Sequence, residues 1–144
     1  MTKDGISKLL VKIDAQRRVS KILFYGKHIG EEYIVTTRNG FCGIELKYDT
    51  DTGNEIQRTY LGKDGKPTNT ILCYSIIKRE YDEYNRPVKT IYLDTDGVTL
   101  CKHFNGNCGF ISEYDNNGNE IYQLLEDKLR YSQHFRIISD EGRR

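Results

Sequence analysis

The dipeptide Tyr-Asp occurs three times at nearly even spacing, as Tyr48-Asp49, Tyr81-Asp82 and Tyr114-Asp115. A degenerate first copy is Ile13-Asp14, and the four aspartates lie 35, 33 and 33 residues apart. Self-similarity at a fixed period is the signature of a repeat architecture, in which each copy is one supersecondary unit. The period therefore predicts a repeated scaffold and leaves the chemistry of that scaffold open.

Other positions recur in the same register. Upstream of each dipeptide lies a triplet that ends in a small residue, and the four small residues are Ser7, Cys42, Ser75 and Cys108. Downstream, Val19, Ile56, Val88 and Ile121 recur, followed by Leu23, Tyr60, Tyr92 and Leu125. We expect one repeat domain over residues 1–144, with copies at approximately 4–38, 39–71, 72–104 and 105–138 and a partial turn at 139–144.

Each copy is predicted to be a β-hairpin. Cys42, Ile44, Leu46 and Tyr48 alternate with polar or small residues, and such period-2 alternation is typical of a strand with one buried face. The first and fourth copies repeat the pattern, as Ser7-Leu9-Val11-Ile13 and Cys108-Phe110-Ser112-Tyr114. Ser112 and, in the third copy, Arg79 are polar exceptions to it.

The turn chemistry agrees with hairpins. The aspartate of each copy can accept hydrogen bonds from the turn backbone, while Gly118 and its counterpart Asn85 can take the left-handed conformation. Second strands are expected at 56–61, 88–93 and 121–125, followed in the second and third copies by Asp64-Gly65 and Asp96-Gly97 turns. Alternation from Leu129 to Ile137 predicts one more strand.

The predicted fold is therefore all-β, an extended antiparallel meander of repeated hairpins. The repeated small residues and tyrosines would form ladders along this sheet. The pattern does not decide whether the sheet stays open, curls or closes.

Composition excludes some classes of partner. Lys and Arg number 22 against 21 Asp and Glu, with no basic stripe, so the sequence predicts no nucleic-acid or membrane-surface partner. Met1-Thr2-Lys3-Asp4-Gly5 is followed by no long apolar run, so we expect no signal peptide and no transmembrane segment. The compartment stays undetermined, since the chain can be a piece of a longer surface or secreted protein.

The string Tyr114-Asp115-x-x-Gly118-Asn119 resembles the YD repeat of bacterial RHS-type proteins and of teneurins. Tyr48 to Asn54 matches with one inserted residue, and Tyr81 to Arg86 matches with Asn in place of Gly. The period of about 33 residues is longer than in typical RHS repeats. The resemblance implies a β-sheet of repeated strands, used as a shell, spacer or binding surface, and it carries no catalytic residue.

One candidate metal site is the run Cys101-x-His103-x4-Cys108, with Cys73 as a conceivable fourth ligand. Thiolate and imidazole are ligands that zinc prefers, but the spacing matches no established zinc finger. The alternative is that Cys108, which occupies the small-residue ladder, is a buried apolar residue. A Cys-His nucleophilic pair would need His28, His103 or His134, and nothing in the sequence activates one thiol. A disulfide would need an oxidising compartment, for which we see no signal.

The aromatic residues Phe41, Tyr74 and Tyr122 form a candidate binding surface. Phe41 and Tyr74 share one register position on the face opposite the small-residue ladder, while Tyr122 lies on the second strand of its copy. Aromatic rows can anchor a protein partner or stack on sugars, unless a second layer of the same chain covers them. We expect a non-enzymatic scaffold without cofactors that binds protein; a carbohydrate-binding module and a thiol- or metal-dependent enzyme are the alternatives. Edge strands offer a route to a dimer.

Overall fold

The computed structural model describes residues 5–101 and 107–125, and within them the protein is all-β, with nine strands in one open antiparallel sheet. The strands are β1 (Lys8–Ile13), β2 (Val19–His28), β3 (Glu31–Ile34), β4 (Gly43–Tyr48), β5 (Glu55–Leu61), β6 (Ile76–Tyr81), β7 (Pro87–Leu93), β8 (Gly109–Tyr114) and β9 (Glu120–Leu125). The prediction of an all-β meander is confirmed, and the sheet is not closed into a barrel. No helix that could cross a membrane occurs in this described part of the chain.

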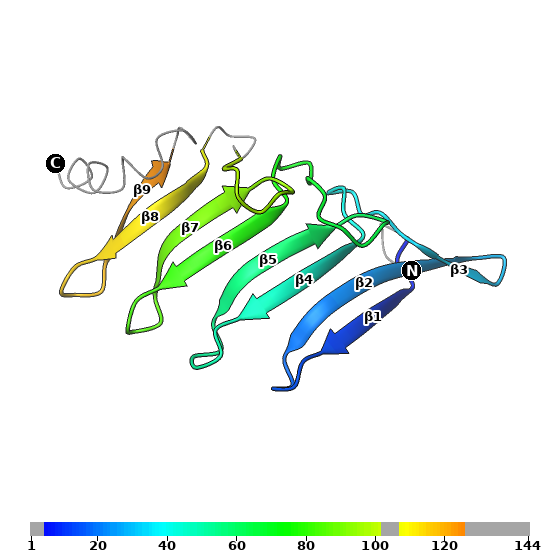
Figure 1. The fold of residues 1–144 in the computed structure, drawn as a ribbon, viewed down its shortest axis with the longest axis horizontal. Helices are drawn as coiled ribbons and strands as arrows, with labels where there is room; N and C mark the ends of the chain where they lie inside the picture. The colour runs from blue at the N-terminus through cyan, green and yellow to red at the C-terminus, as the bar shows by residue number, and fades with distance from the viewer. Residues whose placement is uncertain (1–4, 102–106, 126–144) are drawn as a thin grey trace.

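Four hairpins lie side by side in chain order: β1–β2, β4–β5, β6–β7 and β8–β9. Figure 1 shows their tight turns along one end of the sheet and the longer connections along the other. The short strand β3, which the sequence did not predict, pairs with the far end of β2 and forms an arm beyond the sheet. The Asp64-Gly65 and Asp96-Gly97 turns lie in the long connections and close single bridges, Leu61 to Pro67 and Leu93 to Leu100.

The aspartate of each copy closes its hairpin turn. One carboxylate oxygen accepts two backbone N–H groups in every turn: Gln16 and Arg18 on Asp14, Asp51 and Thr52 on Asp49, Tyr84 and Arg86 on Asp82, and Asn117 and Asn119 on Asp115. Gly118 and Asn85 have φ values of 83° and 63°, so the predicted left-handed turn residues are confirmed.

The tyrosine of the repeat joins one hairpin to the previous one. Its hydroxyl donates a hydrogen bond to a backbone carbonyl at the start of the preceding hairpin's second strand: Tyr48 to Val19 at 2.6 Å, Tyr81 to Glu55 at 2.8 Å, and Tyr114 to Pro87 at 2.8 Å. The predicted tyrosine ladder is therefore confirmed. It explains why the dipeptide is repeated, because tyrosine bonds the neighbouring hairpin while aspartate closes its own.

We call the contacts between hairpins (β2 with β4, β5 with β6, β7 with β8) the seams. At each seam an aromatic residue donates its N–H to the carbonyl of a ladder residue: Phe24 to Cys42, Tyr60 to Ser75, and Tyr92 to Cys108, at 3.0, 2.8 and 2.9 Å. Small residues suit this close approach. A Cβ on Gly109, beside Cys108, would lie 2.1 Å from the carbonyl oxygen of Thr90.

The sequence pattern predicts that Cys42 and Ile44 lie on the same face of the strand, and this prediction is wrong. The Cys42 N–H bonds the carbonyl of Leu61 although Gly43 is the register partner of Leu61, so two residues face one and the strand bulges. The bulge shifts the side-chain parity. Cys108, the counterpart of Cys42, accordingly packs with Ile111 and Leu93, opposite the face of Phe110.

The core is thin and lies on one face near the long connections. Ile76, Leu93, Cys108 and Ile111 pack there beneath Leu100, which comes from the β7–β8 connection. We call this the core face. The expectation that the apolar alternation of β1 is buried is wrong, because β1 is an edge strand without cover: Leu9, Val11 and Ile13 are 53%, 43% and 62% exposed.

Replacing the tyrosine hydroxyl should weaken the seam. We expect Tyr81→Phe to lower the free energy of unfolding by about 1 kcal/mol, because the net worth of one such hydrogen bond is of that order. Urea denaturation of the variant measures the loss. Tyr84→Phe is the control, since Tyr84 is 69% exposed; equal stability of the two variants would contradict the assignment.

Acid should destabilise the turns. Hydrogen bonds from Thr99 and from the Val98 N–H lower the pKa of Asp96 from 3.8 to about 2, so the unfolded chain takes up its proton first. The contribution is complete above pH 3.8 and is lost as pH falls toward about 2. We expect Asp96→Asn, which keeps an acceptor oxygen, to reduce the pH dependence of the urea midpoint in this range. An unchanged slope would contradict the prediction.

Candidate functional site

The face opposite the core face carries most of the aromatic side chains, and we call it the aromatic face. Cross-strand pairs place Ile44 beside Tyr60, Ile77 beside Tyr92, and Leu46 beside Arg58 on this face. Every strand of the described residues belongs to one sheet, so no second layer of secondary structure covers it. A sheet face that is apolar and has no cover offers a binding surface.

Five rings form a continuous row across three hairpins, the aromatic row: Phe24, Phe41, Tyr60, Tyr74 and Tyr92. Their successive centroids are 5.8, 4.8, 6.2 and 4.6 Å apart, and the last pair is stacked at 15°. Phe41 and Tyr74 come from the connections and fit between rings of the strands. The structure therefore brings the predicted pair onto one row through Tyr60.

Tyr74 is buried, with 6% of its surface exposed, so the expectation that it is an exposed aromatic is wrong. Burial raises the pKa of the Tyr74 phenol to about 12, with smaller contributions from Tyr60 and Tyr92. Phe41 and Tyr60 are half-buried. The row thus holds the hairpins together and presents the remaining ring surface to solvent.

Charged side chains follow the row toward the turns. The Glu55 carboxylate accepts hydrogen bonds from Arg58 of the same strand at 2.8 and 3.1 Å. It also accepts one at 3.3 Å from Arg79, across the β5–β6 seam. The Glu55 hydrogen bond and charge raise the pKa of Arg58. Arg79, the polar exception in the sequence pattern, is therefore paired on this face. The carboxylate fixes both guanidinium groups while they stay about one third exposed.

At the turn end of the aromatic face, arginines lie over the repeat tyrosines of the next hairpin. The Arg86 guanidinium is 4.2 Å from the ring centroid of Tyr114 and forms an ion pair with Asp82 at 2.8 Å. Arg18 lies 5.6 Å from the ring centroid of Tyr48. These cation–π contacts add to the tyrosine hydroxyl bonds at the β2–β4 and β7–β8 seams.

Tyr122, the third predicted aromatic, lies in β9 opposite Ser112. In the fourth copy, Asn107 occupies the position that Phe41 and Tyr74 hold in the earlier copies. The Asn107 side chain instead accepts the N–H of Gly109 at 3.2 Å.

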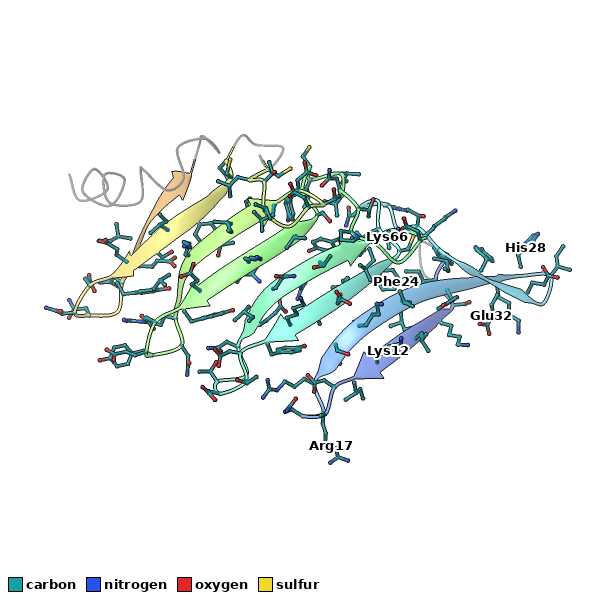
Figure 2. The ribbon with its side chains drawn as sticks, viewed as in Figure 1. Lys12, Arg17, Phe24, His28, Glu32 and Lys66 are labelled. Carbon is teal, nitrogen blue, oxygen red and sulfur yellow. The ribbon has the colours of Figure 1, made fainter. Side chains whose placement is uncertain are left out.

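Of the predicted thiol site, the structure describes Cys73, Cys101 and Cys108. Cys108 is fully buried in the apolar core, and the half-buried Cys101 thiol donates to the carbonyl of Cys73 at 2.8 Å. His103 and His134 lie outside the described residues, and Figure 2 shows His28 at the tip of the β2–β3 arm. Among the described residues no three His, Cys, Asp or Glu side chains could hold a metal, and all four cysteines are free thiols.

A groove of about 540 Å³ lies between the second and third hairpins near their turns. Most of the residues that line it have polar or charged side chains, Gln57, Lys78 and Lys89 among them. Lys89 forms an ion pair with Glu80 at 2.5 Å. The groove is open to solvent and carries no aromatic row, so we take the aromatic face as the stronger candidate for binding.

Removing the Tyr74 hydroxyl should change the stability at alkaline pH. The pKa of Tyr74 is raised from 10.0 to about 12 by burial, so this residue stabilises the fold fully below pH 10 and loses its contribution as pH rises toward 12. We expect Tyr74→Phe to flatten the alkaline fall of the urea midpoint. Tyr84→Phe should leave the fall unchanged, and equal curves for both variants would contradict the assignment.

Cys108 should behave as part of the core. We expect Cys108→Ala to cost about 1–2 kcal/mol through the cavity it leaves, and the loss should be the same with and without zinc. Thermal unfolding with zinc or a chelator measures this. Cys101→Ser is the control, expected within about 0.5 kcal/mol of the parent chain. A zinc-dependent rise in Tm that disappears in Cys108→Ala would overturn the packing role.

No protein-family model, curated protein or solved structure matches this chain.

Proposed function

We propose that this protein is a non-enzymatic repeat scaffold of the YD (RHS-like) type that binds a protein partner on its aromatic face. The observation that carries the proposal is an apolar, aromatic and arginine-bearing face on a sheet that has no second layer among the described residues. We also propose that the chain belongs to a larger bacterial surface or secreted protein, and the support for this is the YD resemblance alone.

The chemistry of the face favours protein. Tyrosine and arginine are enriched among the residues that dominate protein interfaces, since both combine a large contact area with hydrogen bonding. Arg58 and Arg79 are held by Glu55, so their positions are fixed before a partner arrives. A pre-organised side chain loses less entropy on binding.

Carbohydrate binding is the weaker candidate. A sugar ring stacks on an open aromatic face, but Tyr74 is 6% exposed and covers one face of Tyr92. Phe41 and Tyr60 are tilted at 55° to each other, so they form no flat platform. A protein partner needs no such platform, because it can fit an uneven surface.

Photo-crosslinking from two neighbouring residues separates the two faces. Leu46 and Lys47 are adjacent in β4; Leu46 pairs with Arg58 on the aromatic face and Lys47 with Gln57 on the core face. Each position is replaced in turn by benzoylphenylalanine, and the protein is irradiated in an extract of the source organism. We expect a discrete protein adduct from position 46 and none from 47. Adducts from position 47 alone would overturn the choice of face.

The arginines should contribute to affinity for the partner so identified. We expect Arg79→Ala to weaken binding about tenfold, the size of a typical interface hot spot. Isothermal titration measures the change, and circular dichroism checks the fold. The exposed Lys63→Ala is the control. Affinity that is unchanged in Arg79→Ala would contradict the proposed contact.

A further inference from the structure

The three seams pair their strands in the same register, so the strand edges that meet at one seam are equivalent to those that meet at the other two. Lys21 faces Glu45, Gln57 faces Lys78, and Lys89 faces Ile111, each at the same position in its copy. The backbone bonds from Phe24, Tyr60 and Tyr92 to the ladder carbonyls repeat with this register. Any second strand of a hairpin is therefore complementary in backbone to any first strand.

Each outer strand of the described sheet corresponds to one of the two strands that form a seam. β1 is a first strand and β9 is a second strand, and within the described residues neither has a strand on its outer edge. Carrying the seam register over to these two strands places Leu10 opposite Ile121 and Lys8 opposite Gln123. It also places the Leu124 N–H against the carbonyl of Ser7.

The exposed side chains match in this register. Leu10 is 40% exposed and Ile121 is 42% exposed, and both lie on the core face. All six residues of β1 are exposed, and an exposed edge strand is a template for another strand. In this register the Leu10 and Ile121 side chains face each other, and the contact would bury both.

Charge selects the partner strand. β1 carries Lys8 and Lys12 and no acidic residue, while β9 carries Glu120 and no basic residue. Antiparallel pairing of two β1 strands centred on Leu10 would set Lys8 against Lys12, and like charges directly opposite are unfavourable. Pairing of β1 with β9 avoids this repulsion.

We propose that the β1 edge of one molecule is a docking site for the β9 edge of a second copy, in the register Leu10 to Ile121. The contact continues the internal seam between molecules. It is heterologous, since each copy uses a different edge, and it therefore builds open-ended chains of copies. The proposal is independent of what binds the aromatic face.

Two edge-blocked variants of the full chain test the proposal. Leu10→Lys blocks β1, and Ile121→Lys blocks β9 and sets a lysine opposite Glu113 of its own hairpin, so that two blocked edges would set lysine against lysine. In sedimentation velocity we expect the parent chain to grow with concentration and each variant alone to stay monomeric. An equimolar mixture should form a 1:1 dimer and stop there, because one free β1 meets one free β9. Val98→Glu, an 80% exposed apolar site away from both edges, should associate like the parent.

A third variant should strengthen the contact. Ile13 stands where the inner seams have the tyrosine that bonds the preceding hairpin, and the matching carbonyl on a second copy is that of Glu120. We expect Ile13→Tyr to lower the self-association Kd about threefold to tenfold, the worth of one hydrogen bond. Dimers of Ile121→Lys alone would establish β1–β1 pairing instead, and a monomeric parent and mixture would show that the two edges do not pair. Either result overturns the proposal.

Discussion

The hydrogen bond from each repeat tyrosine to the preceding hairpin is the interaction on which the sheet depends most. A single-layer sheet has no second layer to hold its hairpins together, so the stabilising contacts between them have to be lateral. Tyr81 supplies such a contact at the turn end of the β5–β6 seam, and Tyr74 supplies another at the opposite end. Between them lies the paired backbone with the ion pair of Arg79 and Glu55.

This lateral organisation determines where function can be located. The core face is occupied near the long connections by Leu100 and its apolar neighbours. On the aromatic face Tyr74 is buried while Phe41 and Tyr60 are half-buried, so the row holds the sheet together and also contributes to its candidate binding surface. The ring contacts hold these side chains in place before a partner binds, and pre-organised side chains lose less entropy on binding.

The sequence period predicted the fold class, the hairpin turns and their left-handed residues, because each depends on local chemistry that every copy repeats. It did not predict which strands would be edges, so the apolar pattern of β1 was misread as buried. Nor could alternation alone reveal the bulge at Cys42, which changes the face of the residues before it. The burial of Tyr74 was missed for a related reason: it depends on Tyr60 in β5 and Tyr92 in β7, which belong to two different copies. The recurrence of those two tyrosines at one register position was the signal that could have revealed the row.

Native-state hydrogen exchange of Tyr81→Phe tests the central role of the tyrosine bond most directly. The amide of Tyr60 reports the β5–β6 seam, that of Tyr92 reports the β7–β8 seam, and that of Ser75 reports pairing inside the third hairpin. We predict a selective loss of protection at Tyr60, with Ser75 and Tyr92 retaining theirs. Equal loss at all three amides, or no loss at Tyr60, would contradict the claim that each tyrosine secures its own seam.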